Sequence, residues 1–433
     1  MFDINKCKKV YIVGIKGVGS AALAEMLKSN GYDVSGSDID EEFLTDIALK
    51  HAGISVFKFG EGDFKGVDAI VRSVAYNQDN NIDIKKAYEL KIPIFTYPEV
   101  VSYFFNSVFG IAVVGSHGKT TTTAMLADIL YKSGLNLNSI VGSVVNDWGS
   151  GSKTNNLNRS DAVFVLEADE YREAFLNYKS KGAIITNIDY DHPDCYKTED
   201  EYKFAFLKFA ESIQDGGFLV VNKDDKNLLK IVKDLKCKVI FFGKDNLKIF
   251  HLKIPGEHNI MNANAAFLAA LELGVSESDA KKYLEEFNGT ARRFEVVGKI
   301  KDAVIVDDYA HHPSEIKATL RGAREVFPDK KLVAIFQPHT YSRTKIFFND
   351  FIEALKLADE VVLTDIFSSA RESFDGSVSI KNMSDSIGDN SFYIQNKDDI
   401  AGYCKKYLIE DVVIIFMGAG DIWQSAKMLC GSR

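Results

Sequence analysis

Residues 111–121 read IAVVGSHGKTT, four apolar residues that run into a glycine-rich turn and a Lys-Thr-Thr segment. The run Ile111–Val114 predicts a buried strand, and the spacing of the apolar residues after the turn predicts a helix over Thr121–Ser133. In a loop that joins a strand to a helix in this way, backbone N–H groups surround phosphates, the lysine reaches the β and γ groups, and the first hydroxyl binds Mg²⁺. The stretch therefore predicts a site for ATP or GTP, although Val113 stands where the full pattern has its first glycine. The residues of this predicted phosphate loop are Gly115, Ser116, His117, Gly118, Lys119, Thr120 and Thr121.

Similar apolar runs, rich in β-branched residues, recur along the chain and alternate with segments of helical spacing. This alternation is typical of an α/β fold in which parallel sheets carry helices on both faces. The predicted strands are Val10–Ile15, Ala69–Val74, Ile111–Val114, Ala162–Leu166, Ala183–Thr186, Lys238–Phe242, Val304–Val306, Leu332–Phe336, Glu360–Leu363 and Val412–Phe416. The predicted helices include Ala21–Asn30, Pro98–Phe105, Thr121–Ser133, Ile260–Leu273 and Ser314–Val326.

The length of 433 residues indicates about three domains at roughly 150 residues each. We predict these domains over residues 1–107, 108–296 and 297–433. Within the middle domain, Asn146–Ser160 is rich in Gly, Ser and Asn and is expected to be a mobile surface loop.

The composition narrows the class of protein. Hydrophobic residues make up 46% and charged residues 26% of the chain, as in ordinary soluble globular proteins. The net charge of −9 argues against a nucleic-acid partner. The five cysteines, without a Cys-x-x-Cys pair, argue against a disulfide framework and a structural zinc site. No apolar run has the length of a signal peptide or a membrane span, so we expect a cytoplasmic protein without membrane insertion.

A second glycine-rich turn follows the first predicted strand. Gly14, Gly17 and Gly19 precede a predicted helix, whose N-terminus offers unpaired N–H groups to an anion. Asp38 ends a further possible strand, about where a ribose-binding acid is expected. The spacing is Gly-x-x-Gly-x-Gly rather than Gly-x-Gly-x-x-Gly, so three interpretations stay open: a structural turn, an NAD(P) site and a site for another nucleotide diphosphate.

Acidic residues follow two further predicted strands. Because the carboxyl ends of parallel strands meet at the ligand-binding edge of a sheet, Glu167 and His192 are predicted to contact a metal ion there. The other acids of these two segments are expected to be solvated loop charges. They are Asp169, Glu170, Asp189 and Asp194.

With these segments in place, the chain resembles the Mur ligase family. The further segments that carry the resemblance are Asp191–Asp194, Gly256–Ala263, Gly289–Glu295, Asp307–Glu315, Phe336–Thr344 and Gly418–Ile422. Their order and spacing cover essentially the whole chain. The resemblance implies a Rossmann-like N-terminal domain, a central mononucleotide-binding parallel sheet and a Rossmann-like C-terminal domain, which bind the UDP part of a precursor, ATP and the incoming amino acid, respectively. It also implies ATP-dependent amide synthesis in the assembly of peptidoglycan precursors.

Within the family, the N-terminal glycine turn, Asp307–Pro313 and Gln337–His339 are similar to those of members that join L-alanine to UDP-N-acetylmuramate. The resemblance therefore implies that ATP and Mg²⁺ convert the muramoyl carboxylate into an acyl phosphate, which the amine of L-alanine attacks. We expect a monomer or a homodimer.

The resemblance also implies roles for individual residues. The implied catalytic residues are Lys119, His192 and Arg292. The implied ATP site adds Asn259, Asn262, Arg292 and Asp308 to the phosphate loop, and Thr120, Glu167 and His192 are the implied metal ligands. Gly14, Gly17, Gly19 and Asp38 are assigned to the UDP-sugar. Tyr309, His311, His339 and Arg343 are assigned to the amino acid, since the planar fork of an arginine suits an α-carboxylate.

Bland interpretations of the same residues remain. Asn259 and Asn262 also suit helix capping. The adjacent Arg292 and Arg293 also suit a solvent-exposed face, and His311 and His339 each suit a buried structural position.

Three departures from the family pattern set the alternatives. Thr340 stands where a second arginine is frequent, Ala310 replaces a usual glycine, and Tyr171-Arg172 replaces a frequent Ser-Asp pair. The tyrosine also occurs in the related ligase that attaches a recycled tripeptide to UDP-muramic acid, which is the nearest alternative. Two other classes of protein also stay open as alternatives: an NAD(P)-dependent oxidoreductase, and a nucleotide-regulated binding protein that catalyses no reaction.

Overall fold

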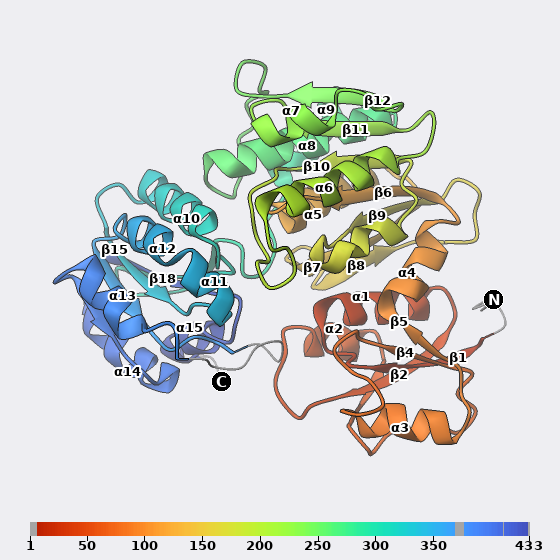
Figure 1. Ribbon diagram of the computed structural model, residues 1–433, viewed down its shortest axis with the longest axis horizontal. Helices are drawn as coiled ribbons and strands as arrows, with labels where there is room; N and C mark the ends of the chain where they lie inside the picture. Colours follow the sequence, from red (N-terminus) through yellow and green to blue (C-terminus); the bar gives the residue numbers. More distant parts are fainter. Residues whose placement is uncertain (1–6, 369–375, 410, 432–433) are drawn as a thin grey trace. The chain divides into compact units, whose positions relative to one another are not determined.

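A computed structural model describes residues 7–368, 376–409 and 411–431 (Figure 1). It divides into two compact units, which are described separately. The first unit comprises Met1–Asp189, Lys203–His251 and Asn262–Thr290, and the second comprises Tyr190–Tyr202, Leu252–Met261 and Ala291–Arg433. Three sheets, of five, seven and six strands, give the chain its predicted three-domain α/β fold.

The N-terminal sheet is parallel throughout and has the strand order β3-β2-β1-β4-β5. Its strands are β1 (Lys9–Val13), β2 (Asp33–Asp38), β3 (Ser55–Lys58), β4 (Ala69–Arg72) and β5 (Ile94–Thr96). Its helices are α1 (Val18–Ser29), α2 (Asp46–His51), α3 (Ile82–Glu89) and α4 (Tyr97–Phe105). The strand order reverses at β1, so the glycine turn after β1 lies at the switch point, where open α/β sheets bind ligands.

The central sheet has the order β12-β11-β10-β6-β9-β7-β8. Its strands are β6 (Phe109–Val114), β7 (Leu137–Val145), β8 (Ser150–Thr154), β9 (Val163–Glu167), β10 (Gly182–Ile185), β11 (Phe218–Asn222) and β12 (Lys238–Phe242). The helices of this region are α5 (Lys119–Lys132), the 3₁₀ helix η2 (Tyr171–Asn177), α6 (Glu199–Glu211), α7 (Lys226–Ile231), α8 (Glu257–Glu272) and α9 (Glu277–Glu286). Strand β6 pairs with both β9 and β10, which places the predicted phosphate loop between the carboxyl ends of these two strands.

The C-terminal sheet has the order β13-β14-β18-β15-β16-β17. Its strands are β13 (Glu295–Ile300), β14 (Ala303–Asp308), β15 (Lys331–Phe336), β16 (Glu360–Leu363), β17 (Ser391–Tyr393) and β18 (Val412–Met417). Its helices are α10 (Pro313–Val326), α11 (Tyr341–Ile346), α12 (Phe348–Leu355), α13 (Ile380–Ile387), α14 (Ile400–Cys404) and α15 (Trp423–Leu429), with the 3₁₀ helices η3 (Lys397–Asp399) and η4 (Lys405–Ile409). Successive residues of β14 and β15 enter two separate apolar cores, one with α10, α12 and α13 and the other with α14 and α15. A sheet buried on both faces explains its continuous apolar runs.

The ten predicted strands and five predicted helices are all present, with ends that differ by no more than three residues. The loop predicted over Asn146–Ser160 is wrong at Ser150–Thr154, which forms β8 and pairs antiparallel with β7. Helix α1 packs against this β-hairpin, and the Ser150 hydroxyl donates a hydrogen bond of 2.5 Å to the Glu25 carboxylate. Tertiary contacts therefore order a segment whose composition favours a loop.

Within the described residues, no helix combines the length and the apolar character needed to cross a lipid bilayer.

Candidate active site

Two glycines give the predicted phosphate loop its shape. Gly118 caps the N-terminus of α5 in the left-handed conformation, with φ of 79°, and Gly115 has φ of 137°. A Cβ atom on Gly115 would lie 2.0 Å from the Thr186 hydroxyl, and one on Gly118 would lie 2.4 Å from Oδ1 of Asn262. Both positions therefore require glycine, and Asn262 is one of the predicted nucleotide residues that the fold brings to the loop.

Residues that follow β10 hold the loop from the other side. The backbone N–H of His117 donates to Oδ1 of Asn187 at 3.0 Å, and the Thr186 hydroxyl donates to the His117 carbonyl at 2.6 Å. The ring of His117 lies 3.0 Å from the Asp189 carboxylate. The two strand ends, far apart in sequence, thus form one rigid edge, as the parallel order predicts.

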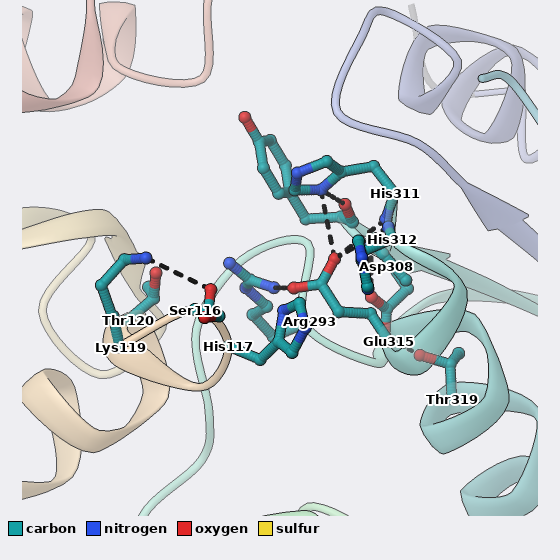
Figure 2. Close-up of polar contacts among 12 residues, drawn as sticks. Ser116, His117, Lys119, Thr120, Arg293, Asp308, His311, His312, Glu315 and Thr319 are labelled. Carbon is teal, nitrogen blue, oxygen red and sulfur yellow. Dashed lines mark hydrogen bonds and ion pairs between the residues drawn. The ribbon is translucent and has the colours of Figure 1, made fainter. Parts of the chain in front are cut away.

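Lys119 turns back over the loop that carries it. Its ammonium donates to the Gly115 carbonyl at 2.5 Å and to the Glu170 carboxylate at 2.7 Å. It also donates to the Ser116 carbonyl at 3.2 Å (Figure 2). Burial would lower the pKa of Lys119, but the charges of Glu170 and Asp169 outweigh it and raise that pKa, so the ammonium stays charged. A cation held against loop carbonyls lies where the β and γ phosphates of a nucleotide are expected.

The prediction that Glu170 is a solvated loop charge is wrong. Its side chain is 0% exposed and forms the ion pair with Lys119. A buried carboxylate requires such a partner because desolvation of a lone charge is costly.

Two of the three predicted metal ligands lie side by side. The Thr120 hydroxyl donates to Oε1 of Glu167 at 2.8 Å, and Oε2 of Glu167 accepts the backbone N–H of Gly142 at 2.5 Å. A hydroxyl and a carboxylate beside the phosphate loop are the oxygen ligands that Mg²⁺ prefers, so these residues fit the ion. His192, the third predicted ligand, belongs to the second unit and has φ of 56°. Its assignment to the metal stays a prediction.

The three predicted UDP-sugar glycines differ in what surrounds them. Gly14 has φ of 82°, and a Cβ atom there would lie 2.7 Å from the ring of Tyr76. A Cβ atom on Gly19 would lie 3.0 Å from the Tyr97 hydroxyl, whereas one on Gly17 would meet only the Gly14 carbonyl, at 3.6 Å. Gly14 and Gly19 therefore have structural reasons to be glycine, while Gly17 leaves the helix N-terminus open.

The predicted ribose acid lies beside a cavity. Asp38 is buried and accepts the backbone N–H groups of Lys16 at 2.7 Å and Ile39 at 2.9 Å. These hydrogen bonds lower the pKa of the Asp38 carboxyl, but burial has the larger effect and raises it. A cavity of about 670 Å³ lies along β3 and next to the end of β2, and three lysines and three carboxylates line it: Lys16, Lys50, Lys58, Asp40, Asp46 and Glu61. Lys16 pairs with Asp46 and Lys58 with Asp40, so the lining is mixed in charge. The volume of the cavity suits part of a nucleotide.

In the second unit, the predicted amino-acid residue Tyr309 lies between two arginines. The guanidinium groups of Arg292 and Arg293 lie 4.9 and 5.1 Å from the centre of its ring. Glu315 joins Arg293, at 3.7 Å, to the ring of His311, at 3.2 Å (Figure 2). Burial lowers the pKa of His311 to about 3, so its ring is neutral at physiological pH.

Arg343 and His339, also assigned to the amino acid, are in direct contact. Nη1 of Arg343 donates to Nδ1 of His339 at 3.3 Å, and the other edge of the guanidinium faces Asp191, with Nε and Nη2 both 2.9 Å from Oδ1. Burial alone would raise the pKa of Asp191, but the charge of Arg343, with smaller contributions from neighbouring histidines, holds it well below its usual range. The sequence predicts no site role for Asp191, although this residue lies immediately before His192 in a segment that carries the family resemblance.

The remaining predicted nucleotide residues are engaged within the second unit. Arg292 is buried, with Nε 3.2 Å from Asp307 and Nη1 3.1 Å from the Gly420 carbonyl. Asp308 is buried and accepts the Ala310 backbone N–H at 2.8 Å, and the Asn259 amide donates to the Pro255 carbonyl at 2.6 Å. The interpretation of Arg292 as part of a solvated face is wrong, because its side chain is buried. The nucleotide roles of the three residues stay predictions.

Together, the fold and the loop define a three-domain α/β protein with a phosphate-loop motif at the switch point of its central sheet. Comparison with protein families matches three models that between them span most of the chain. The Mur ligase family, catalytic domain, matches residues 9–108, the Mur ligase middle domain matches residues 113–270, and the Mur ligase, glutamate ligase domain, matches residues 292–420. The chain belongs to the Mur ligase family.

Relatives and solved structures agree with this. A UDP-N-acetylmuramate--L-alanine ligase of Desulfitobacterium hafniense (strain Y51) is 38% identical over 97% of this chain and 99% of its own. The crystal structure of the UDP-N-acetylmuramate-alanine ligase MurC from Thermotoga maritima matches with a TM-score of 0.79 and 28% identity, over 97% of this chain and 98% of that one. A murein peptide ligase from Psychrobacter arcticus 273-4 shares the fold, with a TM-score of 0.73 and 24% identity over 98% of each chain.

Proposed function

We propose that this chain joins L-alanine to the carboxylate of UDP-N-acetylmuramate at the expense of ATP, through an acyl phosphate, in peptidoglycan precursor synthesis. The observation that carries the proposal is a phosphate loop after β6 in which Lys119 is followed directly by Thr120, whose hydroxyl donates to Glu167 at the end of β9. The chain is also similar over nearly its whole length to ligases of that name. A lysine and a metal-binding pair at a phosphate loop are the groups that phosphoryl transfer needs.

The central domain would bind ATP and Mg²⁺. Residues Gly115–Thr121 would surround the phosphates with backbone N–H groups, and Asn262 would contact the nucleotide from α8. Thr120 and Glu167 would hold the ion, with His192 as a further ligand; when bound, Mg²⁺ neutralises phosphate charge and orients the terminal group. Lys119 would leave Glu170 and the loop carbonyls to donate to the β and γ phosphate oxygens. Arg292, Asp308 and Asn259 would complete the nucleotide site.

The N-terminal domain would bind the UDP-sugar. The open helix N-terminus at Gly17, in the turn with Gly14 and Gly19, suits the diphosphate, and the volume of the cavity next to Asp38 suits the rest of the nucleotide. The C-terminal domain would bind L-alanine through Tyr309, His311, His339 and Arg343. These roles correspond to domains over residues 1–107, 108–296 and 297–433.

The reaction would then proceed in two steps. A muramoyl carboxylate oxygen attacks the γ phosphorus in line, the bond from that phosphorus to the β–γ bridging oxygen breaks, and ADP leaves with Lys119 offsetting the charge. The α-ammonium group of L-alanine first loses one proton to solvent, and the neutral amine then attacks the acyl carbon. The carbon–oxygen bond to phosphate breaks, and the nitrogen loses a second proton to solvent. The products are the amide, ADP and phosphate. We propose that this takes place in the cytoplasm, on a monomer or a homodimer.

Phosphate release from ATP and Mg²⁺ tests the proposal, with UDP-N-acetylmuramate and one acceptor at a time. We expect L-alanine to exceed glycine and L-serine, with glycine reduced by roughly 10- to 200-fold because only a methyl contact is lost. The tripeptide of the recycling ligases is the fourth acceptor. Phosphate release with the tripeptide and none with L-alanine would overturn the proposal in favour of that related activity, and absence of release with all four would exclude the ligase.

A further inference from the structure

The ion pair between Asp191 and Arg343 is buried and distant in sequence. Both side chains are only 5% exposed, and both belong to the second unit. One oxygen of Asp191, Oδ1, accepts hydrogen bonds from Nε of Arg343 at 2.9 Å and from the backbone N–H of His192 at 2.6 Å. The same oxygen forms an ion pair with Nη2 of Arg343, also at 2.9 Å. Asp191 therefore fixes one edge of the guanidinium in place.

The pairing leaves part of the guanidinium available. An arginine has five N–H donors. Two face Asp191 and one faces His339, so two have no partner among the described residues. Two N–H donors from one guanidinium are what a carboxylate accepts in a bidentate pair.

The second oxygen of Asp191 is also available. The hydrogen bonds to Asp191 from the described residues go to Oδ1, and Oδ2 lies 3.9 Å from Nε2 of His192. That separation is too long for a hydrogen bond. Oδ2 of Asp191 is thus a charged oxygen that accepts no hydrogen bond from the described residues, and it lies on the same ion pair as the two remaining N–H donors of Arg343. It can accept a hydrogen bond from a cationic or polar N–H group.

We propose that the pair binds the amino-acid substrate as a zwitterion: Oδ2 of Asp191 accepts a hydrogen bond from the α-amino group, and the two remaining N–H donors of Arg343 bind the α-carboxylate. The inference rests on the proposed function for the use of a free amino acid as acceptor. Arg343 alone would bind any small carboxylate, whereas the neutral Asp191–Arg343 pair favours an acid that also brings an amino group. Asp191 is thereby a specificity-determining residue.

Calorimetric binding to the intact protein, loaded with a non-hydrolysable ATP analogue and Mg²⁺, tests this with two ligands, L-alanine and propionate, which lacks the amino group. For Asp191→Asn we expect L-alanine binding to weaken by about 10- to 100-fold, the effect of losing one charge-assisted hydrogen bond, while propionate binding changes less than threefold. The matched control is Asp385→Asn, on an exposed position of α13, which should leave both affinities unchanged.

A purely structural role of Asp191 predicts a different result. If the carboxylate only holds Arg343, Asp191→Asn weakens L-alanine and propionate by the same factor, and this outcome would overturn the proposal. Should the asparagine variant fail to fold, Asp191→Glu retains the charge, and the proposal requires that it still favours L-alanine over propionate. Failure of the proposed function is seen separately, in the wild-type protein, as phosphate release that does not depend on L-alanine.

Discussion

Replacement of Lys119 separates the contribution of this residue to folding from its contribution to chemistry. The Lys119→Met variant removes the cation predicted to contact phosphate and also breaks the ion pair between Lys119 and Glu170, whose side chain is 0% exposed. Breaking a buried ion pair costs about 3–5 kcal/mol, and because the Lys119 side chain is 15% exposed we expect the lower end, about 3 kcal/mol. Loss of a donor to the transferred group lowers kcat by roughly 10²- to 10³-fold.

The double variant Lys119→Met/Glu170→Gln tests whether the two effects have separate causes. Glutamine removes the buried negative charge that the Lys119 ammonium balanced, so most of the lost stability should return while phosphate release stays at the level of the single variant. Urea denaturation followed by tryptophan fluorescence measures the first effect, since Trp148 lies in the same unit, and phosphate release measures the second. The control Lys132→Met, in the last turn of the same helix, also breaks an ion pair with a buried carboxylate, that of Asp128, so it should lose stability and yet retain activity.

Two results would refute this reasoning. Parental turnover in Lys119→Met would remove the lysine from the phosphate site. A double variant no more stable than the single variant would mean that Glu170 is not the source of the instability.

Three further predictions concern other contacts. Burial raises the pKa of Glu25 to about 7, so the folded protein holds this proton more tightly than the unfolded chain, and stability falls as pH rises from about 4.5 to 7. At pH 8 Glu25→Gln, which keeps an acceptor for Ser150, should be more stable than wild type by about 2 kcal/mol in urea, and at pH 4 no more stable; an equal difference at both pH values would contradict this. Gly142→Ala puts a Cβ atom 2.5 Å from the Glu167 carboxylate, so the Mg²⁺ concentration for half-maximal phosphate release should rise at least about tenfold, and an unchanged Mg²⁺ titration would remove Glu167 from the ion. Arg343→Lys loses the planar fork and should raise the KM for L-alanine by about 10- to 100-fold with little change in the KM for ATP, whereas equal changes in both would refute its assignment.

Much of the fold is predictable because its strands are buried on both faces. Continuous β-branched runs such as Val412–Phe416 mark such strands without reference to the rest of the chain. Strand β8 was not predicted, because Ser150–Thr154 has little intrinsic strand preference and is ordered by β7 and α1. The antiparallel strand β13, at Glu295–Ile300, falls on the predicted domain boundary, where no regular element was expected.

Part of the candidate site can likewise be predicted from the sequence, and part of it cannot. The phosphate loop could be predicted because its residues are contiguous and each has a separate physical reason to be there. Glu170 and Asp191 could not, since their partners lie 51 and 152 residues away and spacing in the sequence does not report such pairs. A local pattern gives the type of chemistry, and the fold determines which charges meet.

Transfer of oxygen-18 tests the central claim most directly. UDP-N-acetylmuramate labelled with oxygen-18 in its carboxylate is incubated with the protein, ATP, Mg²⁺ and L-alanine, and the released phosphate is analysed by mass. An acyl phosphate requires one labelled oxygen in each phosphate, because the carbon–oxygen bond that breaks leaves the substrate's own oxygen on phosphorus. Phosphate without label, formed together with the amide, would contradict the account.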